Sequence, residues 1–299
     1  MIKVKLHYLV MPWQIDYALL SYIQLRKSIY HLSKDVEVTI DTHLNLSNYI
    51  IDWDESKLPK DFFINKFNSL ASLLKDYEVN SYIYEGDENY GLLDMQRMAY
   101  GEEFDYYIPL CPDIEFDETT LSYLIESARM VENKYFVITP EIYKKWDWTW
   151  DDATNKEFLN VPYENWNKGN IFDTRHRLNN ITSETLLAPA KNHKWAIWFD
   201  IYSKSFYEEL CPIQEDWTGY GPWDLYSMTI SEYVKKLGVD VQAYILRGKT
   251  ILDYTEYTSY YKDMLSIKVS ALEQRAVFES KMSEYISKAL QNLKNKNII

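Results

Sequence analysis

Alternating apolar and polar positions at the start of the chain predict a strand, a helix and a second strand. Residues 4–11 alternate and are rich in β-forming side chains, so they predict a strand that ends at Pro12. Apolar residues then recur at helical spacing from Asp16, which predicts a helix to about residue 32. Residues 36–40 predict a second strand that ends in Asp41. These three elements within about 40 residues are typical of a crossover unit in a parallel sheet.

The same alternation of helical and strand patterns continues along the chain and predicts an α/β fold. A stretch rich in Trp, Asn and Asp, residues 140–190, interrupts it and predicts long surface loops. An amphipathic pattern from residue 266 onward predicts a C-terminal helix. The remaining predicted helices are 61–77, 92–100, one after Asp117, 204–210 and 224–237, and the remaining predicted strands are 80–84, 105–110, 135–139, 195–200 and 239–246.

Composition fits a globular protein. The 299 residues are 46% hydrophobic and 26% charged, with 8 Gly and 9 Pro, a length that suits one large α/β domain or two smaller ones. The two cysteines, Cys111 and Cys211, cannot build a disulfide scaffold, which favours a reducing compartment. Because no run of about 18 apolar residues occurs, we expect no transmembrane segment and a cytoplasmic location.

The net charge of -13, from 45 acidic against 32 basic residues, argues against a broad nucleic-acid-binding surface. The acidic residues concentrate in residues 101–120, which contain no Lys or Arg. A cation is therefore expected there. The 27 Tyr and 10 Trp would suit a cleft that stacks sugar or base rings, but AT-rich codon usage explains them equally well.

Asp113 and Glu115 follow a buried-type strand directly, and they form the first candidate site. Divalent cations that bind phosphates prefer hard oxygen ligands, which two carboxylates at i and i+2 supply. Asp-x-Glu is also a common solvated turn, but ligands of α/β sheets gather at the carboxyl ends of strands, where this pair is predicted to lie.

A glycine-containing loop, residues 219–224, forms the second candidate site. It places Asp224 at the start of a predicted helix. An aspartate among aromatic rings suits a general base for a hydroxyl group, although Asp224 would equally cap the helix. Asp216 lies eight residues earlier and competes for the role of base.

Several common catalytic motifs are missing from the sequence, among them GxGxxG, GxxxxGK[ST], HExxH and GxSxG. The five histidines are far apart along the chain, so the sequence predicts no histidine metal cluster. They are His7, His31, His43, His176 and His193.

Taken in order, the pieces resemble nucleotide-sugar glycosyltransferases of the GT-A fold, closest to family 2, over about residues 3–250. Cys111 stands where the family has its first metal-binding Asp, and Trp223 replaces a Glu. The chain is also similar to glycosyltransferases encoded by tailed bacteriophages, which would place it in the host cytoplasm. The residues that carry the resemblance are Asp41, Asn89, Arg97, Asp113, Glu115 and Asp224.

This resemblance implies a GT-A, Rossmann-like fold with a mixed, mostly parallel sheet flanked by helices. It implies one domain over residues 1–255, with a donor half to about 118 and an acceptor half after it, followed by a helical extension over 256–299. A nucleoside-diphosphate sugar would be the donor, and a glycan, a protein or a modified nucleobase the acceptor. Donor-binding residues would be Trp13, Asp41, Asn89, Arg97 and Asp113.

The resemblance also implies the chemistry. A Mn or Mg ion would lie on Asp113 and Glu115, and Asp224, or else Asp216, would deprotonate the acceptor in an inverting transfer of a hexosyl or pentosyl group. The acceptor would stack on Trp217, Tyr220 and Trp223. Two alternatives stay open: a GT-A-like glycan-binding module without catalysis, suggested by Cys111, and a nucleotidyltransferase, which should carry a basic Gly-rich loop near its N-terminus.

Overall fold

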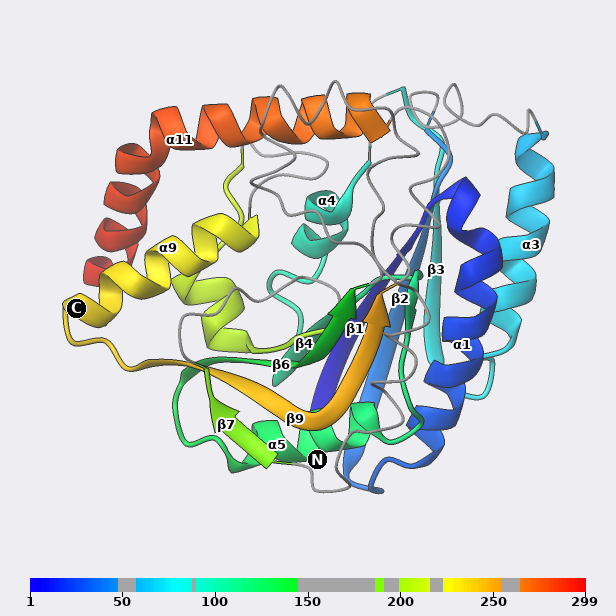
Figure 1. Cartoon of the computed structure of the whole chain (residues 1–299), viewed down its shortest axis with the longest axis horizontal. Helices are drawn as coiled ribbons and strands as arrows, with labels where there is room; N and C mark the ends of the chain where they lie inside the picture. The colour runs from blue at the N-terminus through cyan, green and yellow to red at the C-terminus, as the bar shows by residue number, and fades with distance from the viewer. Residues whose placement is uncertain (48–57, 88–89, 145–185, 191–198, 216–222, 254–263) are drawn as a thin grey trace.

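A twisted sheet forms the centre of the molecule, and helices cover both of its faces (Figure 1). This computed structural model describes the chain outside residues 48–57, 88–89, 145–185, 191–198, 216–222 and 254–263. A few side chains of the described elements, including those of Trp13 and Asp224, also lie outside the description. Within the described part the strand order is β3-β2-β1-β4-β8-β6-β9-β5, and β7 pairs with β9.

The N-terminal part of the sheet is parallel, as the alternation of strand and helix patterns predicts. Strand β1 lies between β2 and β4, and β3 pairs with the far side of β2. Helices provide the crossovers between these strands. The elements are β1 (Ile2–Val10), α1 (Ile15–Tyr30), β2 (Val36–Asn45), α3 (Lys60–Ser72), β3 (Glu78–Tyr84), α4 (Leu92–Arg97) and β4 (Tyr106–Leu110).

The other part of the sheet is mixed. Strand β8 runs antiparallel between β4 and β6, whereas β6 and β9 are parallel to each other. Strands β5 and β7 add to β9 in antiparallel pairing. The fold class predicted from the sequence, a mixed and mostly parallel sheet flanked by helices, is therefore confirmed. The elements are β5 (Ile114–Glu115), β6 (Tyr135–Lys144), β7 (Leu186–Pro189), β8 (Ile201–Ser203) and β9 (Val241–Asp253).

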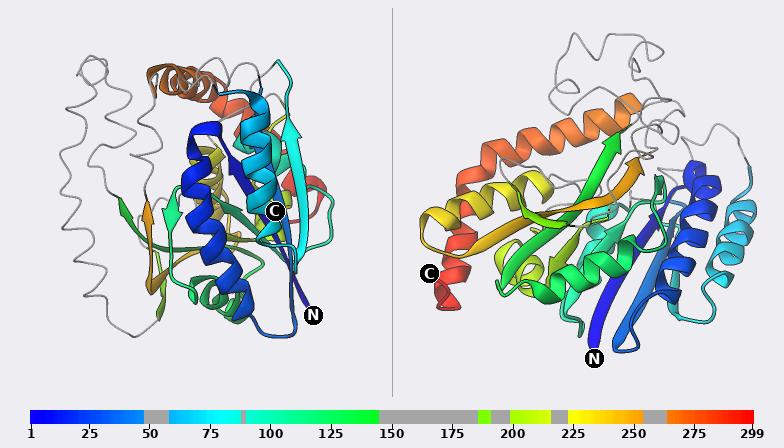
Figure 2. Two further views of the ribbon diagram at one scale, coloured as in Figure 1. Left: turned by 90° about the vertical axis from the view of Figure 1, so that its right-hand side faces the viewer. Right: turned by 60° about the horizontal axis from the view of Figure 1, so that its bottom comes forward.

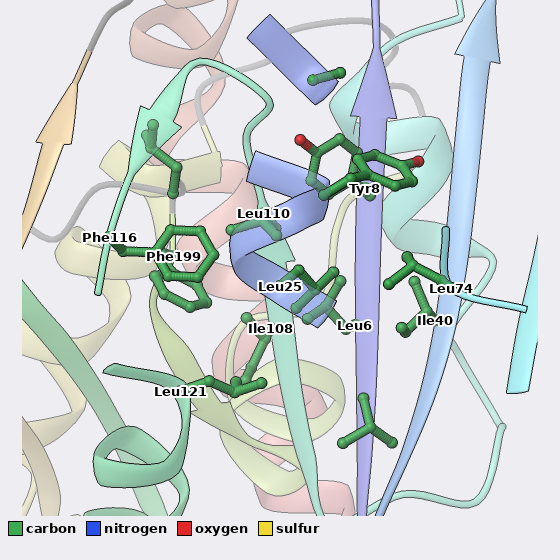
Figure 3. Close-up of a cluster of buried hydrophobic side chains, with 14 of the residues drawn as sticks. Leu6, Tyr8, Leu25, Ile40, Leu74, Ile108, Leu110, Phe116, Leu121 and Phe199 are labelled. Carbon is green, nitrogen blue, oxygen red and sulfur yellow. The ribbon is translucent and has the colours of Figure 1, made fainter. Parts of the chain in front are cut away.

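Helices α1, α3 and α5 (Thr120–Met130) cover one face of the sheet and form the first hydrophobic core. Figure 3 shows Leu6 and Tyr8 of β1 among side chains of the neighbouring elements, with Leu25 of α1 between them in this view. Even-numbered residues of β1 point to this face because successive side chains of a strand alternate. Odd-numbered residues, including Lys5 and His7, therefore face the other side.

The C-terminal helices lie on the opposite face of the sheet (Figure 2). A second hydrophobic core forms between them and the sheet. A short π-helix, η3 (Phe206–Leu210), and helices α4, α9 (Trp223–Lys236) and α11 (Met264–Asn295) contribute to it. The C-terminal part of α11 buries Tyr285, Ala289 and Leu293 in this core. Among the described helices, none combines the length and the apolar character needed to cross a bilayer.

Several predicted boundaries are wrong, and strand pairing explains those of β2 and β6. Strand β2 continues past Asp41 to Asn45 because β1 and β3 pair with it on both sides. Strand β6 continues past Pro140, where a register shift against β9 accommodates the proline, so residues 140–190 are not loop throughout. The described residues of the strand predicted at 195–200, Phe199 and Asp200, precede β8 and do not belong to a strand.

Candidate functional site

Asp113 lies where the carboxyl ends of β1 and β4 meet. Because these two strands are parallel neighbours, the turn after β4 comes next to η1 (Pro12–Gln14), the short helix after β1. Asp113 is only 4% exposed, and its Oδ2 accepts a hydrogen bond of 3.3 Å from Gln14 Nε2. The structure therefore places a nearly buried carboxylate at the edge of the sheet where α/β proteins bind ligands.

Glu115 lies at the same edge, on the two-residue strand β5. Its backbone pairs with Leu252 of β9, and its side chain is half-buried. Asp117, which follows, forms an ion pair of 3.1 Å with Lys249 of β9. Contacts with strand β9, from the C-terminal part of the chain, thus hold this end of the acidic stretch in place.

Arg97, at the end of α4, connects this helix to the loop before α9. One guanidinium nitrogen lies 3.1 Å from Asp94 Oδ1, and the other donates a 2.7 Å hydrogen bond to the carbonyl of Gln214. The side chain of Gln214 donates in turn to the hydroxyl of Tyr226 on α9, at 3.1 Å. Gln214 thereby connects α4 to α9. Asp216, Trp217 and Tyr220 fall within the segment 216–222, outside the described residues.

Trp223 has no exposed face. It is fully buried in the second core, donates a 2.7 Å hydrogen bond from Nε1 to the carbonyl of Cys211, and packs edge-on against Tyr202 and Tyr207. An acceptor cannot stack on a ring that is packed on all sides, so the structure gives Trp223 the role of fixing the start of α9. Asp224 is the second residue of this helix.

Asp41 lies inside β2 instead of at its end, and it is 1% exposed. Its Oδ1 accepts a 2.9 Å hydrogen bond from Asn80, and its Oδ2 lies 2.7 Å from Lys5 Nζ. Lys5 also contacts Glu102 at 2.7 Å. At the end of β2 the structure has Asn45, whose amide donates to the carbonyl of Tyr90. Asn89 lies outside the described residues.

Two histidines accompany Asp41, although the sequence predicts no histidine cluster. His7 of β1 is the register partner of Asp41, and His43 follows two residues later on the same face of β2. Burial lowers the pKa of both imidazoles, that of His43 to about 3 with a further contribution from nearby His7. Burial would raise the pKa of Asp41, but His7, Lys5 and Asn80 outweigh it and the pKa is lowered. The cluster therefore consists of one carboxylate, that of Asp41, and two neutral imidazoles, those of His7 and His43.

Asp200 is a buried acid that the sequence does not single out. It precedes β8, is fully buried, and accepts a 2.9 Å hydrogen bond from the hydroxyl of Tyr202. Burial raises the pKa of this carboxyl group to about 7, while hydrogen bonds from Thr139 and Tyr202 act in the opposite direction. Asp200 therefore holds a proton at mildly acidic pH.

We expect Asp200→Asn to stabilise the protein more at pH 8 than at pH 5. The folded protein keeps a proton that the unfolded chain releases above the ordinary pKa of 3.8, so stability falls as pH rises toward about 7. Asparagine cannot ionise, so the Asp200→Asn variant does not lose this stability as the pH rises. The gain in unfolding free energy should grow by about 2–3 kcal/mol between the two pH values. Urea unfolding at both pH values measures it, and an equal growth in the exposed-site control Asp61→Asn would contradict it.

Comparisons with known proteins give likenesses in structure only. No protein-family model and no curated sequence matches the chain. Among solved structures, S. aureus TarS 1-349 is 12% identical with a TM-score of 0.49, over 87% of this chain and 62% of that one. GalNAc-T7 with UDP, GalNAc and Mn2+ has the same identity and TM-score, over 100% of this chain and 55% of that one.

Both are GT-A fold glycosyltransferases. TarS 1-349 in complex with UDP-GlcNAc is 11% identical with a TM-score of 0.48, over 87% of this chain and 61% of that one. This chain spans less than two thirds of the length of each of these three structures. They belong to the class that the sequence resembles.

Proposed function

We propose that the chain is a glycosyltransferase that moves a sugar from a nucleoside-diphosphate sugar to an acceptor hydroxyl. The observation that carries the proposal is the nearly buried Asp113 at the joined carboxyl ends of β1 and β4, held by Gln14 and followed by Glu115. Parallel strands whose ends meet in this way form the usual ligand site of an α/β sheet. Asp113 and Glu115, which resemble the metal-binding motif of family 2, both lie at this edge.

A divalent ion fits these residues. Mg2+ and Mn2+ prefer oxygen ligands, and Asp113 and Glu115 supply carboxylates at the place where a donor diphosphate would bind. The ion, when bound, would offset the negative charge that develops on the departing diphosphate. Cys111 stands in the position of the family's first metal-binding Asp, so we assign the ion to the two acids that remain.

The other residues would bind the substrates and move the proton. Gln14 would orient the Asp113 carboxylate, and Arg97 would hold the loop before α9 in place through Gln214. Asp224, at the start of α9, would take the proton from the acceptor hydroxyl as it attacks the anomeric carbon, which inverts that centre. Asp216 is the alternative base. Tyr220 and Trp217 would contact the acceptor.

The proposal predicts slow, metal-dependent hydrolysis of one class of nucleotide sugar in the absence of an acceptor. We would incubate the protein with a panel of UDP-, GDP- and dTDP-sugars, with Mn2+ or with EDTA, and measure the release of nucleoside diphosphate. One donor should be cleaved, and EDTA should abolish the cleavage. Neither cleavage nor binding of any donor would contradict the proposal and favour a glycan-binding module. Release of pyrophosphate from a nucleoside triphosphate and a sugar phosphate would instead indicate a nucleotidyltransferase.

A further inference from the structure

Three buried ligand atoms converge on one point between β1 and β2. One nitrogen of His7, one carboxylate oxygen of Asp41 and one nitrogen of His43 lie within 4.8 Å of one another. Each side chain is at most 1% exposed. The atoms free of hydrogen bonds to the described residues are His7 Nε2, Asp41 Oδ2 and His43 Nε2. A buried polar atom without a hydrogen bond costs about 1–3 kcal/mol. Asp41 Oδ2 has ionic contacts with Lys5 at 2.7 Å and with His7 Nε2 at 3.2 Å, but His43 Nε2 has no polar partner among the described residues. One ion bound between the three side chains would serve all of them.

The outer atoms of the same side chains are, by contrast, hydrogen-bonded. His7 Nδ1 lies 3.3 Å from the Tyr107 hydroxyl, and His43 Nδ1 lies 3.1 Å from the Tyr90 hydroxyl. Asn80 donates to Asp41 Oδ1. Metal-binding histidines and carboxylates are oriented in this way, with the outer atom held and the inner atom left for the ion.

The hydroxyl of Tyr90 lies 3.1 Å from both the sulfur of Met98 and His43 Nδ1. When its proton is directed to Met98, the Tyr90 oxygen accepts from His43 Nδ1–H. A neutral imidazole has one N–H, and His43 Nε2 therefore presents a lone pair to the cluster. Facing it is a carboxylate oxygen, which is also an acceptor. Acceptors that face one another are stabilised by a cation between them.

We propose that His7, Asp41 and His43 bind a divalent transition metal ion of the zinc class, at a site distinct from Asp113 and Glu115. Two imidazoles and one carboxylate are a ligand set for Zn2+ and its neighbours, whereas Mg2+ prefers oxygen alone. The three proposed ligands come from adjacent strands, so the bound ion would link β1 to β2. A cavity of about 190 Å³ reaches one of the three proposed ligands, His43, and Tyr82 and Tyr90 also line it.

Lys5 is a cation in direct contact with this site. Its Nζ lies 2.7 Å from Asp41 Oδ2, and His7 Nε2 lies 3.2 Å from the same oxygen, but neither contact has hydrogen-bonding geometry. Lys5 also lies 2.7 Å from Glu102, a half-exposed acid. An ion bound to Asp41 would leave Lys5 paired with Glu102. Lys5 and the ion thus compete for one carboxylate oxygen.

Metal binding can be measured without any assay of transfer. We would remove the first candidate site with Asp113→Asn and Glu115→Gln together, strip metal with EDTA, and titrate the protein with Co2+. We expect one equivalent to bind, with the visible absorption of imidazole-bound Co2+, and Zn2+ to displace it. Failure of this double variant to bind stoichiometric Co2+ or Zn2+ would overturn the proposal. Because it leaves the proposed ligands intact, the test is independent of the proposed glycosyltransferase function.

Single variants locate the ion. His43→Gln should abolish binding, whereas His31→Gln, on an exposed histidine, should leave it unchanged. Tyr90→Phe keeps the ring and removes only the hydroxyl that orients His43, so it should weaken binding about 10–100-fold even if His43→Gln fails to fold. Lys5→Met should tighten binding, because the competing cation is removed. Unchanged affinity in both Tyr90→Phe and Lys5→Met would contradict the assignment.

Discussion

Replacing Asp113 by asparagine is expected to lower metal-dependent cleavage of the donor sugar nucleotide about 10³-fold. The nearly buried carboxylate would hold the ion that stabilises the departing diphosphate, an effect worth several kcal/mol, and each 1.36 kcal/mol is a factor of ten in rate. Asparagine keeps the shape and can still contact Gln14, but it lacks the charge. The rate of diphosphate release at saturating Mn2+, compared with the wild type, measures the loss.

Asp117→Asn is the matched control for this experiment. Asp117 belongs to the same acidic stretch but is paired with Lys249. We expect its loss to leave cleavage within about twofold of the wild type, as is usual when a partly exposed ion pair is removed. Equal losses in Asp113→Asn and Asp117→Asn would mean that the acidic stretch acts through its overall charge. Full activity in Asp113→Asn would remove this residue from the site.

Asp224→Asn is expected to reduce transfer to the acceptor about 10²–10⁴-fold while the affinity for the donor stays the same. General-base catalysis contributes a factor of this size, and the asparagine side chain cannot take a proton. The start of α9 is held by the buried Trp223, so the substitution should leave the helix in place. Initial rates with a saturating acceptor give the loss, and titration calorimetry with the donor gives the affinity.

Asp216→Asn separates the two candidate bases. If Asp224 is the base, the Asp216 variant should retain transfer within about tenfold of the wild type. Loss of transfer in Asp216→Asn, together with normal turnover in Asp224→Asn, would reverse the assignment. In both variants, the thermal unfolding midpoint shows whether the fold is intact.

The sheet could be predicted from the sequence because its parallel half is built from local crossovers. Strands β1, β2 and β4 carry strong alternation or continuous apolar runs, and helices of clear periodicity separate them. The ends of the strands could not be predicted, because β2 and β6 are prolonged by neighbours that pair with them from elsewhere in the chain. Strand β5 has only two residues and exists through its pairing with β9, which no local pattern reveals.

The site was predictable only in part, for the same reason. Asp113 follows a recognisable strand, so its place at the sheet edge could be inferred from the chain alone. His7 and His43 are 36 positions apart in the sequence, and only the β1–β2 register brings them to the same place. The alternation of side chains along a strand could have indicated that these residues share one face of the sheet, since His43 and Asp41 are two residues apart and His7 is at an odd position of β1. Asp200 offers no local signal, because its pKa depends on burial.

The pairing of β5 with β9 has a consequence for how this chain can be made. Glu115 obtains its strand partner from Leu252, and Asp117 its ion pair from Lys249, both more than 130 positions later. A ribosome must therefore synthesise most of the protein before the acidic edge acquires these contacts. We conclude that an N-terminal fragment ending near residue 118 would contain the acids without the support that fixes them. Contacts over such sequence separations also form slowly, so assembly of this edge belongs to the late steps of folding.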